Sequence, residues 1–469
     1  MTQTNQSIKT LYKHNPLETE PVAKLLRQFA IPSIIANLAN SLYNIVDQIF
    51  IGQGVGYLGN AATNIAFPIT TVCLAIGLLT GIGAAANFNL TIGRKDYTTA
   101  RNTLGTAFGF LLLSGFTLAL IVFWQAGPLM AFFGATEKVY PLSVQYVQII
   151  ALGIPFFMLG IGGANLVRAD GSAKYSMTSI LIGAAINMVL DPLFIFVFNW
   201  GIRGAAWATI IGQIASGLFI LAYLPRFKQV DLSFSEITIQ LKELWQIFKL
   251  GINALVFQLS NTIVQIVLNN TLKFVGASSI YGADIPIAAA GITIKINTLF
   301  IGVVIGIVQG AQPILSVNYG AKNYLRVRET FKLEMKVLAV FSLIMFIIFQ
   351  TLTRPLISIF GNGDELYFTY SVHYLRVFLF MTVITGLHIG MANFLSAIGY
   401  GFKSAFLALS KQIIFLLPLI LFLGHTYGVE QVPLAAPLAH GMAFVLAIYF
   451  IYRQFKSMPS ENIVTFTAK

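Results

Sequence analysis

One apolar stretch of the chain, residues 32–52, carries four polar side chains at helical spacing. They are Asn37, Asn40, Asn44 and Asp47. Separations of three, four and three residues place all four on one face of a helix. A carboxylate within a bilayer costs roughly 2.5–3.5 kcal/mol on insertion scales, so Asp47 should face a bundle interior or a water-filled cavity. The amides, with Tyr43 beside them, either line that hydrated wall or bond helices together.

A second acid, Asp191, stands four residues after Asn187 and therefore on the same helical face. Pro192 follows and has no backbone N–H, so the helix should bend or open there. Asp191 is either a cation or proton ligand inside the membrane or a hydrated acid at the outer helix end. Thr209 and Gln213, again four apart, follow in the next apolar segment among small residues that permit close helix packing.

The second half of the chain carries a similar polar stripe without an acid: Gln258, Asn261, Gln265 and Asn269. We interpret these amides as the opposite wall of a cavity, with interhelical bonding as the alternative. Lys295 lies about 13 Å into its apolar segment by helical rise. It either lines the C-lobe cavity, pairs with a polar neighbour, or lies nearer the interface if the segment begins elsewhere. His388 could titrate near neutral pH, although a lone histidine in an apolar segment is more often a packing residue.

The composition that surrounds these residues is that of a polytopic membrane protein. Of 469 residues, 57% are hydrophobic and 10% charged, whereas soluble proteins carry about 25% charged residues. Cys73 is the sole cysteine, which excludes an internal disulfide and a cysteine-based metal site. We predict an all-α fold with twelve transmembrane helices. Their predicted ranges are 25–50, 62–86, 102–125, 143–167, 175–198, 204–225, 246–272, 287–313, 333–352, 370–398, 404–423 and 432–452.

The net charge of +12 does not indicate nucleic-acid binding, because the basic residues gather in alternate short loops. One set of loops holds Lys95, Arg168, Lys228, Lys322 and Lys403, among others. The other set holds little beyond Lys138, Arg203, Lys273 and Arg354. By the positive-inside rule, we expect a multi-pass protein of the plasma membrane with both termini in the cytoplasm.

The chain also repeats itself. Gly83-Ala84 recurs as Gly310-Ala311, and Gly93, Lys95, Tyr97 and Arg101 each recur 227 positions later. With six spans per half, the halves should be parallel repeats, giving two pseudo-symmetric six-helix lobes. The predicted parts are an N-terminal tail 1–24, an N lobe 25–225, a cytoplasmic linker 226–245, a C lobe 246–452 and a C-terminal tail 453–469.

Five motifs across both halves carry a family resemblance. They are Leu-Asp-Pro at 190–192, Arg-Ala-Asp-Gly at 168–171, Gly-Ala-Ala-Trp-Ala-Thr at 204–209, Gln-Gly-Ala-Gln-Pro at 309–313 and Asn-Tyr-Gly-Ala-Lys-Asn-Tyr at 318–324. The chain resembles the multidrug and toxic compound extrusion (MATE) transporters. The resemblance implies a V-shaped pair of lobes around a central cavity. It also implies export of organic, usually cationic or amphipathic, compounds in exchange for H⁺ or Na⁺.

Residue by residue, the resemblance is to the DinF-like branch of bacterial and archaeal type. Asp47 matches the acid of its first helix, and Asn187, Asp191 and Thr209 match the rest of its N-lobe cation network. The NorM-like branch instead uses acids in the seventh and tenth helices, and these apolar segments hold none here. We therefore assign coupling, including any Na⁺ site, to these four residues with Asn44 beside them. The candidate cavity residues are Asn37, Asn40, Tyr43, Gln213, Gln258, Asn261, Gln265, Lys295 and His388.

We expect a secondary active antiporter that needs no cofactor beyond its coupling ion and acts as a monomer. An enzyme is disfavoured because the five histidines are scattered and no nucleophile elbow or phosphate-binding loop is present. A lipid-linked precursor flippase of the same superfamily is the alternative. Its cavity should be strongly cationic, whereas the candidate walls here hold acids and amides.

Overall fold

The structure is a computed structural model that describes residues 15–233, 236–359 and 364–459, and this part of the chain forms helices without strands. The first bundle, called the N lobe, contains α3 Val22–Gly54, α4 Tyr57–Gly93, α5 Tyr97–Trp124, α6 Ala126–Phe132, α7 Tyr140–Ala169, α8 Ala173–Pro192, η1 Leu193–Val197 and α9 Gly201–Leu221. A short helix, α2 Pro16–Thr19, precedes it, and η2 Leu224–Arg226 follows it.

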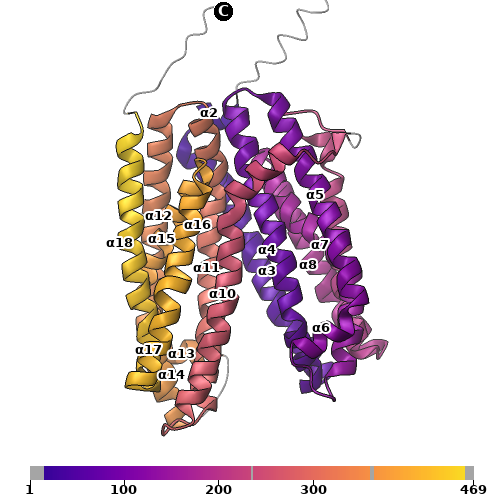
Figure 1. Cartoon of the computed structure of the whole chain (residues 1–469), viewed down its shortest axis with the longest axis vertical. Helices are drawn as coiled ribbons and strands as arrows, with labels where there is room; N and C mark the ends of the chain where they lie inside the picture. The colour runs from indigo at the N-terminus through magenta and orange to yellow at the C-terminus, as the bar shows by residue number, and fades with distance from the viewer. Residues whose placement is uncertain (1–14, 234–235, 360–363, 460–469) are drawn as a thin grey trace, which may run out of the picture.

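The second bundle, called the C lobe, contains α10 Leu241–Gly276, α11 Asp284–Gly320, α12 Tyr324–Thr351, α13 Thr353–Ser358, α14 Glu365–Phe378, α15 Thr382–Ala397, α16 Gly401–Leu409, η4 Ser410–Leu416, α17 Leu417–Tyr427, η5 Val429–Leu434 and α18 Ala435–Ser457. Eleven described helices are long and apolar enough to cross a membrane, and the bent pair α14 and α15 makes a twelfth span. The two bundles converge at the end of the molecule where α2 lies and diverge toward the end where α13 and α14 lie (Figure 1).

Glycines let the lobes approach each other closely at this convergence. A Cβ at Gly83 of α4 would lie 2.0 Å from the Ile247 carbonyl oxygen of α10. A Cβ at Gly251 of α10 would lie 1.9 Å from the Leu79 carbonyl oxygen in return. Because no larger residue fits there, the α4–α10 crossing depends on these two glycines.

The predicted repeat is a structural repeat. Helices α4 and α11 both have 37 residues, and α5 and α12 both have 28. The turns that follow α4 and α11 place Lys95 and Lys322 at φ of 63° and 59°. Asp96 and Asn323 then cap the next helices with their side chains. The same turn chemistry therefore recurs at corresponding points of the two lobes.

Two predicted boundaries differ from the structure. Helix α10 begins at Leu241, inside the predicted linker 226–245. Its first turn is held against the N lobe by Glu243, which is 4% exposed and accepts hydrogen bonds from Asn87 and Thr103, both at 3.2 Å. The predicted N-terminal tail 1–24 is also too long, because α3 begins at Val22. Residues 1–14 and 460–469 of the predicted tails lie outside the described residues.

The predicted tenth span, 370–398, is not one continuous helix. It divides into α14 and α15, which are bent by 42°. The Thr382 hydroxyl donates to the Leu379 carbonyl, and the Thr385 hydroxyl donates to the Met381 carbonyl at 3.0 Å. These side chains occupy carbonyls at the break, where neither proline nor glycine signals a kink in the sequence.

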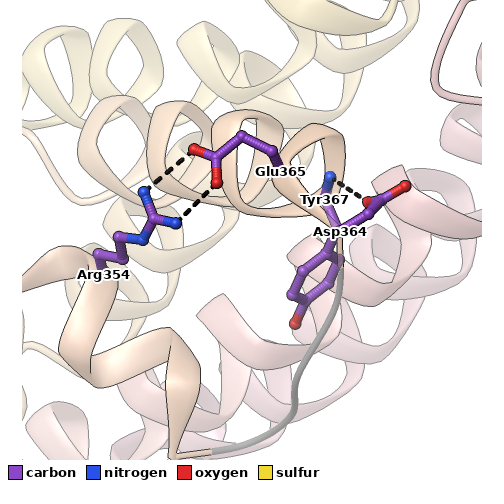
Figure 2. A network of polar contacts seen from close by, with 4 residues as sticks. All are labelled: Arg354, Asp364, Glu365 and Tyr367. Carbon is purple, nitrogen blue, oxygen red and sulfur yellow. Dashed lines mark hydrogen bonds and ion pairs between the residues drawn. The ribbon is translucent and has the colours of Figure 1, made fainter.

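The start of α14 is fixed by two polar contacts (Figure 2). The Arg354 guanidinium of α13 binds the Glu365 carboxylate through two parallel hydrogen bonds of 3.0 and 2.7 Å. Asp364 accepts a hydrogen bond from the Tyr367 backbone N–H at 2.9 Å, which caps the helix. The Arg354–Glu365 contact joins α13 to α14 at the end of the molecule opposite α2.

Candidate functional site

The candidate site lies in the N lobe, where α3, α8 and α9 meet. Helices α8 and α9 approach closely because each presents a glycine: a Cβ at Gly212 would lie 2.6 Å from the Gly183 carbonyl oxygen. This approach brings the Asn187 amide nitrogen of α8 to 3.4 Å from the Thr209 hydroxyl of α9. The same nitrogen donates to Asp191 Oδ1 at 3.2 Å. The two glycines thus allow Asn187 and Thr209, which the sequence analysis identified as candidates, to come into contact.

Asp47 of α3 and Asp191 of α8 come together although 144 positions separate them. Their carboxyl groups lie within reach of a side-chain hydrogen bond. Asp47 is 9% exposed and Asp191 0%, so the alternative of a hydrated acid at the outer helix end is wrong for Asp191. Two ionised carboxylates only accept hydrogen bonds, so a bond between them requires that one carry a proton.

The donor set of this site suits a proton or a hard cation. Asp47 Oδ1 and Asp191 Oδ2 are buried without a hydrogen-bond partner among the described residues. The Thr209 hydroxyl is connected to Asp191 by the Asn187 amide, which bonds both. Carboxylate, hydroxyl and amide oxygens are the ligands that hard cations prefer. The helix after Asp191 also changes at Pro192, where η1 forms a π-helical turn, as the missing N–H predicts.

A polar pocket adjoins the two acids. It holds about 500 Å³ of space free of protein atoms, part of it open to solvent. Asn40, Tyr43, Asn187, Thr209 and Gln213 supply polar groups to its lining, and Phe156, Phe157, Ile161 and Ile180 supply apolar ones. Gln213 Oε1 is buried without a partner among the described residues. The pocket therefore combines apolar walls with a few polar groups, as small-molecule sites do.

Two first-span amides lie elsewhere. Asn37 donates to the Gly302 carbonyl at 3.4 Å and to Gln309 Oε1 at 3.3 Å, both on α11. Asn37 therefore bonds two helices together, which was the alternative interpretation of the first-span amides. Asn44 is exposed and donates to the Asn40 carbonyl of its own helix, so its side chain does not join the acids in this conformation.

The C-lobe candidates are not brought together with the acids. Asn261, Gln265 and Asn269 are exposed on α10, and Gln258 is half-buried. Lys295 is exposed on α11. His388 is 4% exposed and lies inside the C lobe, rather than on an exposed cavity wall.

Sequence reasoning missed residues that tertiary packing brings to the site. Gln48 lies next to the Asp47 carboxylate and donates a hydrogen bond to the Thr63 hydroxyl of α4 at 3.3 Å. Tyr146 of α7 lies within electrostatic range of both acids. The signal available for Gln48 was a second polar residue next to Asp47 in an apolar segment. Nothing in the local pattern distinguishes Tyr146.

The fold and this site define the class of protein. The MatE family model matches residues 32–193 and 258–422, well over half of the chain, and the chain therefore belongs to the MatE family. Members of this family are transporters and not enzymes, and the chain is a multi-pass membrane transporter of small molecules.

Particular relatives agree with this assignment. The multidrug export protein MepA of Staphylococcus aureus strain MRSA252 is 24% identical over 440 residues, which cover 93% of this chain and 94% of that protein. MepA of Staphylococcus saprophyticus is 24% identical over 441 residues with the same coverage. An outward-facing multidrug resistance MATE transporter matches with a TM-score of 0.87 at 21% identity, covering 94% of this chain and 98% of that one. MATE in complex with MaL6 matches with a TM-score of 0.88 at 21% identity and the same coverage. These structures share the fold.

Proposed function

We propose that this chain exports small organic compounds, cationic or amphipathic in character, across the plasma membrane in exchange for H⁺ or Na⁺. The observation that carries the proposal is the pairing of Asp47 and Asp191 inside an apolar helix bundle, next to Asn187 and Thr209. The names of the MepA relatives, which are multidrug export proteins, support the export of small organic compounds.

The coupling follows from the charge of the acid pair. The ionised site favours a hydrated conformation, because a carboxylate in an apolar bundle needs water or donors around it. A proton or a cation neutralises the site and allows α3 to move against α8 and α9. Substrate then leaves the N-lobe pocket to the outside, and loss of the ion resets the transporter. Each step depends on the differential stability of the two states.

The test is substrate efflux from proteoliposomes under a pH gradient and a Na⁺ gradient, imposed separately. Asp47→Asn should reduce gradient-driven efflux to the background rate, because an amide cannot exchange a proton, and Asp191→Asn should impair it strongly. Asp231→Asn is the matched control, because Asp231 is an exposed acid of the linker. Wild-type efflux by Asp47→Asn would place the coupling site elsewhere. Efflux that responds to neither gradient in the unaltered chain would overturn the antiport.

A further inference from the structure

Three basic side chains gather inside the C lobe: His388 of α15, Lys411 of η4 and His440 of α18. His388 is 4% exposed and Lys411 6%. His440 lies within electrostatic range of both, and His388 within range of Lys411. None of the ion pairs among the described residues involves Lys411. A buried ammonium without a counter-charge is costly, so this group calls for an anionic partner.

The hydrogen bonds of the cluster leave nitrogens free for a ligand. The Thr385 hydroxyl gives its one hydrogen to the Met381 carbonyl at 3.0 Å, so its oxygen accepts from His440 Nδ1 at 2.8 Å. The neutral His440 ring then carries its hydrogen on Nδ1, so its Nε2 atom donates to a ligand only when the ring is protonated. His388 Nε2 is buried without a hydrogen-bond partner in the described part of the chain. Among the described residues, His388 Nε2 thus lacks a hydrogen-bond partner, and no ion pair neutralises the Lys411 ammonium.

The cluster occupies the C-lobe position that corresponds to the N-lobe pocket. Left-handed glycines mark matching turns: Gly171 with Gly399, and Gly201 with Gly428. His388 precedes Gly399 by eleven residues, as Gly160 precedes Gly171. Lys411 follows Gly399 by twelve residues, as Gly183 follows Gly171.

The third member of the cluster fits the same correspondence. His440 follows Gly428 by twelve residues, as Gln213 follows Gly201. All three N-lobe counterparts, Gly160, Gly183 and Gln213, line the pocket beside the acids. The C lobe therefore places basic groups where the N lobe has two glycines and an amide.

We propose that His388, Lys411 and His440 form an anion site in the C lobe, which takes one compact monovalent anion, either chloride or a carboxylate group. The ammonium supplies the charge, His388 Nε2 supplies a hydrogen bond, and His440 Nε2 supplies a second one when its ring is protonated. Lys411 lies in the π-helical turn η4, a wider turn that is frequent at functional sites. His388 and Lys411 are both more than nine-tenths buried, so a ligand that contacts both must be small. This inference does not depend on coupling at Asp47.

The test is thermal unfolding of the purified full-length chain in detergent, at fixed pH, over a range of sodium chloride or sodium acetate concentrations. The bulky sulfonate HEPES keeps the ionic strength constant. Binding to the folded state should raise the apparent melting temperature with the logarithm of the anion concentration. The chloride and acetate series distinguish the two sources of the anion.

Variants assign the response to the cluster. Lys411→Met should abolish it and raise the melting temperature without anion, because methionine fills similar space without a buried charge. His388→Gln should weaken the apparent affinity by about tenfold or more, as loss of a hydrogen bond to a charged group does. Lys273→Met, at an exposed lysine of α10, is the matched control and should respond as the unaltered chain does.

Two outcomes would overturn the proposal: an unaltered chain that responds to neither anion, and a Lys411→Met protein that keeps the full response. Asp47→Asn should keep the anion response while it loses gradient-driven efflux. A failure of the N-lobe coupling is therefore distinguishable from a failure of the C-lobe site.

Discussion

At the scale of single residues, the N-lobe site depends on which groups can stabilise a carboxylate in an apolar bundle. Asp47 and Asp191 share one site, and the Asn187 amide is the hydrogen-bond donor that the geometry gives to Asp191. Thr209 orients that amide from the neighbouring helix. Two carboxyl groups that share a site titrate as a pair, so these neutral neighbours should set the ion dependence of transport.

We therefore expect Asn187→Ala and Thr209→Ala to move the pH or Na⁺ concentration of half-maximal efflux more than they lower the maximal rate. Loss of a hydrogen bond to a charged group is worth about 1.5–3 kcal/mol, which corresponds to a shift of about one to two pH units for Asn187→Ala. The shift should be toward higher pH, because the ionised carboxylate loses its donor. The measurement is the initial rate of efflux from proteoliposomes as a function of pH and Na⁺.

The matched control for these variants is Thr178→Ala. Thr178 is a half-buried residue of α8 whose hydroxyl bonds the Lys174 carbonyl of its own helix and none of the site residues. An unshifted midpoint in Asn187→Ala, with a reduced maximal rate, would show that Asn187 packs the bundle and does not tune the acids.

At the scale of elements, one close contact between the lobes is the α4–α10 crossing. Gly251→Ala would place a Cβ 1.9 Å from the Leu79 carbonyl oxygen, so the helices would have to separate. Overpacking of this kind costs about 1–3 kcal/mol, and we expect a lower melting temperature together with slower efflux. Gly441→Ala in α18 is the control, because a Cβ there meets nothing within 4 Å. Equal stability of the two variants would contradict the tight crossing.

A second element-scale device ties the linker to the N lobe. Asp170, in the turn between α7 and α8, accepts hydrogen bonds from the Tyr223 hydroxyl at 2.8 Å and from the backbone N–H groups of Lys228 at 2.8 Å and Gln229 at 3.0 Å. Burial raises the pKa of the Asp170 carboxyl to about 6, although these three donors oppose the shift. The folded chain thus takes up a proton at a pH where the unfolded chain has already lost it.

The sign of the resulting pH dependence follows from linkage. Between the ordinary pKa of 3.8 and the folded value of about 6, the folded state binds more protons, so this group's contribution to stability falls as the pH rises through that window. The fall should be at most about 3 kcal/mol. Asp170→Asn should flatten this part of a melting-temperature profile between pH 4 and 7. An identical slope in both proteins would exclude Asp170 as its source.

At the scale of the whole molecule, the two lobes place their corresponding loops side by side. A Cβ at Gly93 would lie 2.1 Å from the Val317 carbonyl oxygen, so the turns at Lys95 and Lys322 are neighbours. Labels attached near these two residues must therefore report the same side of the membrane. The excess of basic loops predicts that this side is the cytoplasm.

We expect cysteine labels near Lys95, Gln229 and Lys322 to be accessible only from inside, and labels near Lys138 and Tyr427 only from outside. The background should be Cys73→Ser, since Cys73 is 2% exposed and is the sole cysteine. Labels at Lys95 and Lys322 on opposite sides would contradict the fold. A complete reversal would contradict only the orientation.

The sequence by itself determined the class of fold, the repeat and the two acids. These features are local: a run of apolar residues long enough to span a bilayer is helical because its backbone has no other hydrogen-bond partners there. The repeat is visible because the same turn residues recur, as Lys95 and Lys322 do. Asp47 and Asp191 stand out because a charged side chain in an apolar segment is costly to place in a bilayer and usually marks a functional site.

Only the tertiary structure decided which polar residues meet. Asn37 and Asn40 share one face of α3, yet Asn37 bonds α11 and Asn40 lines the N-lobe pocket, because different neighbours cover successive turns. The break before α15 has no proline or glycine to announce it. Lys411 and His440 lie within one cluster with His388 only because three elements distant in sequence pack together. Helical period fixes the face of a side chain, but the partner on that face depends on packing between segments far apart in the chain.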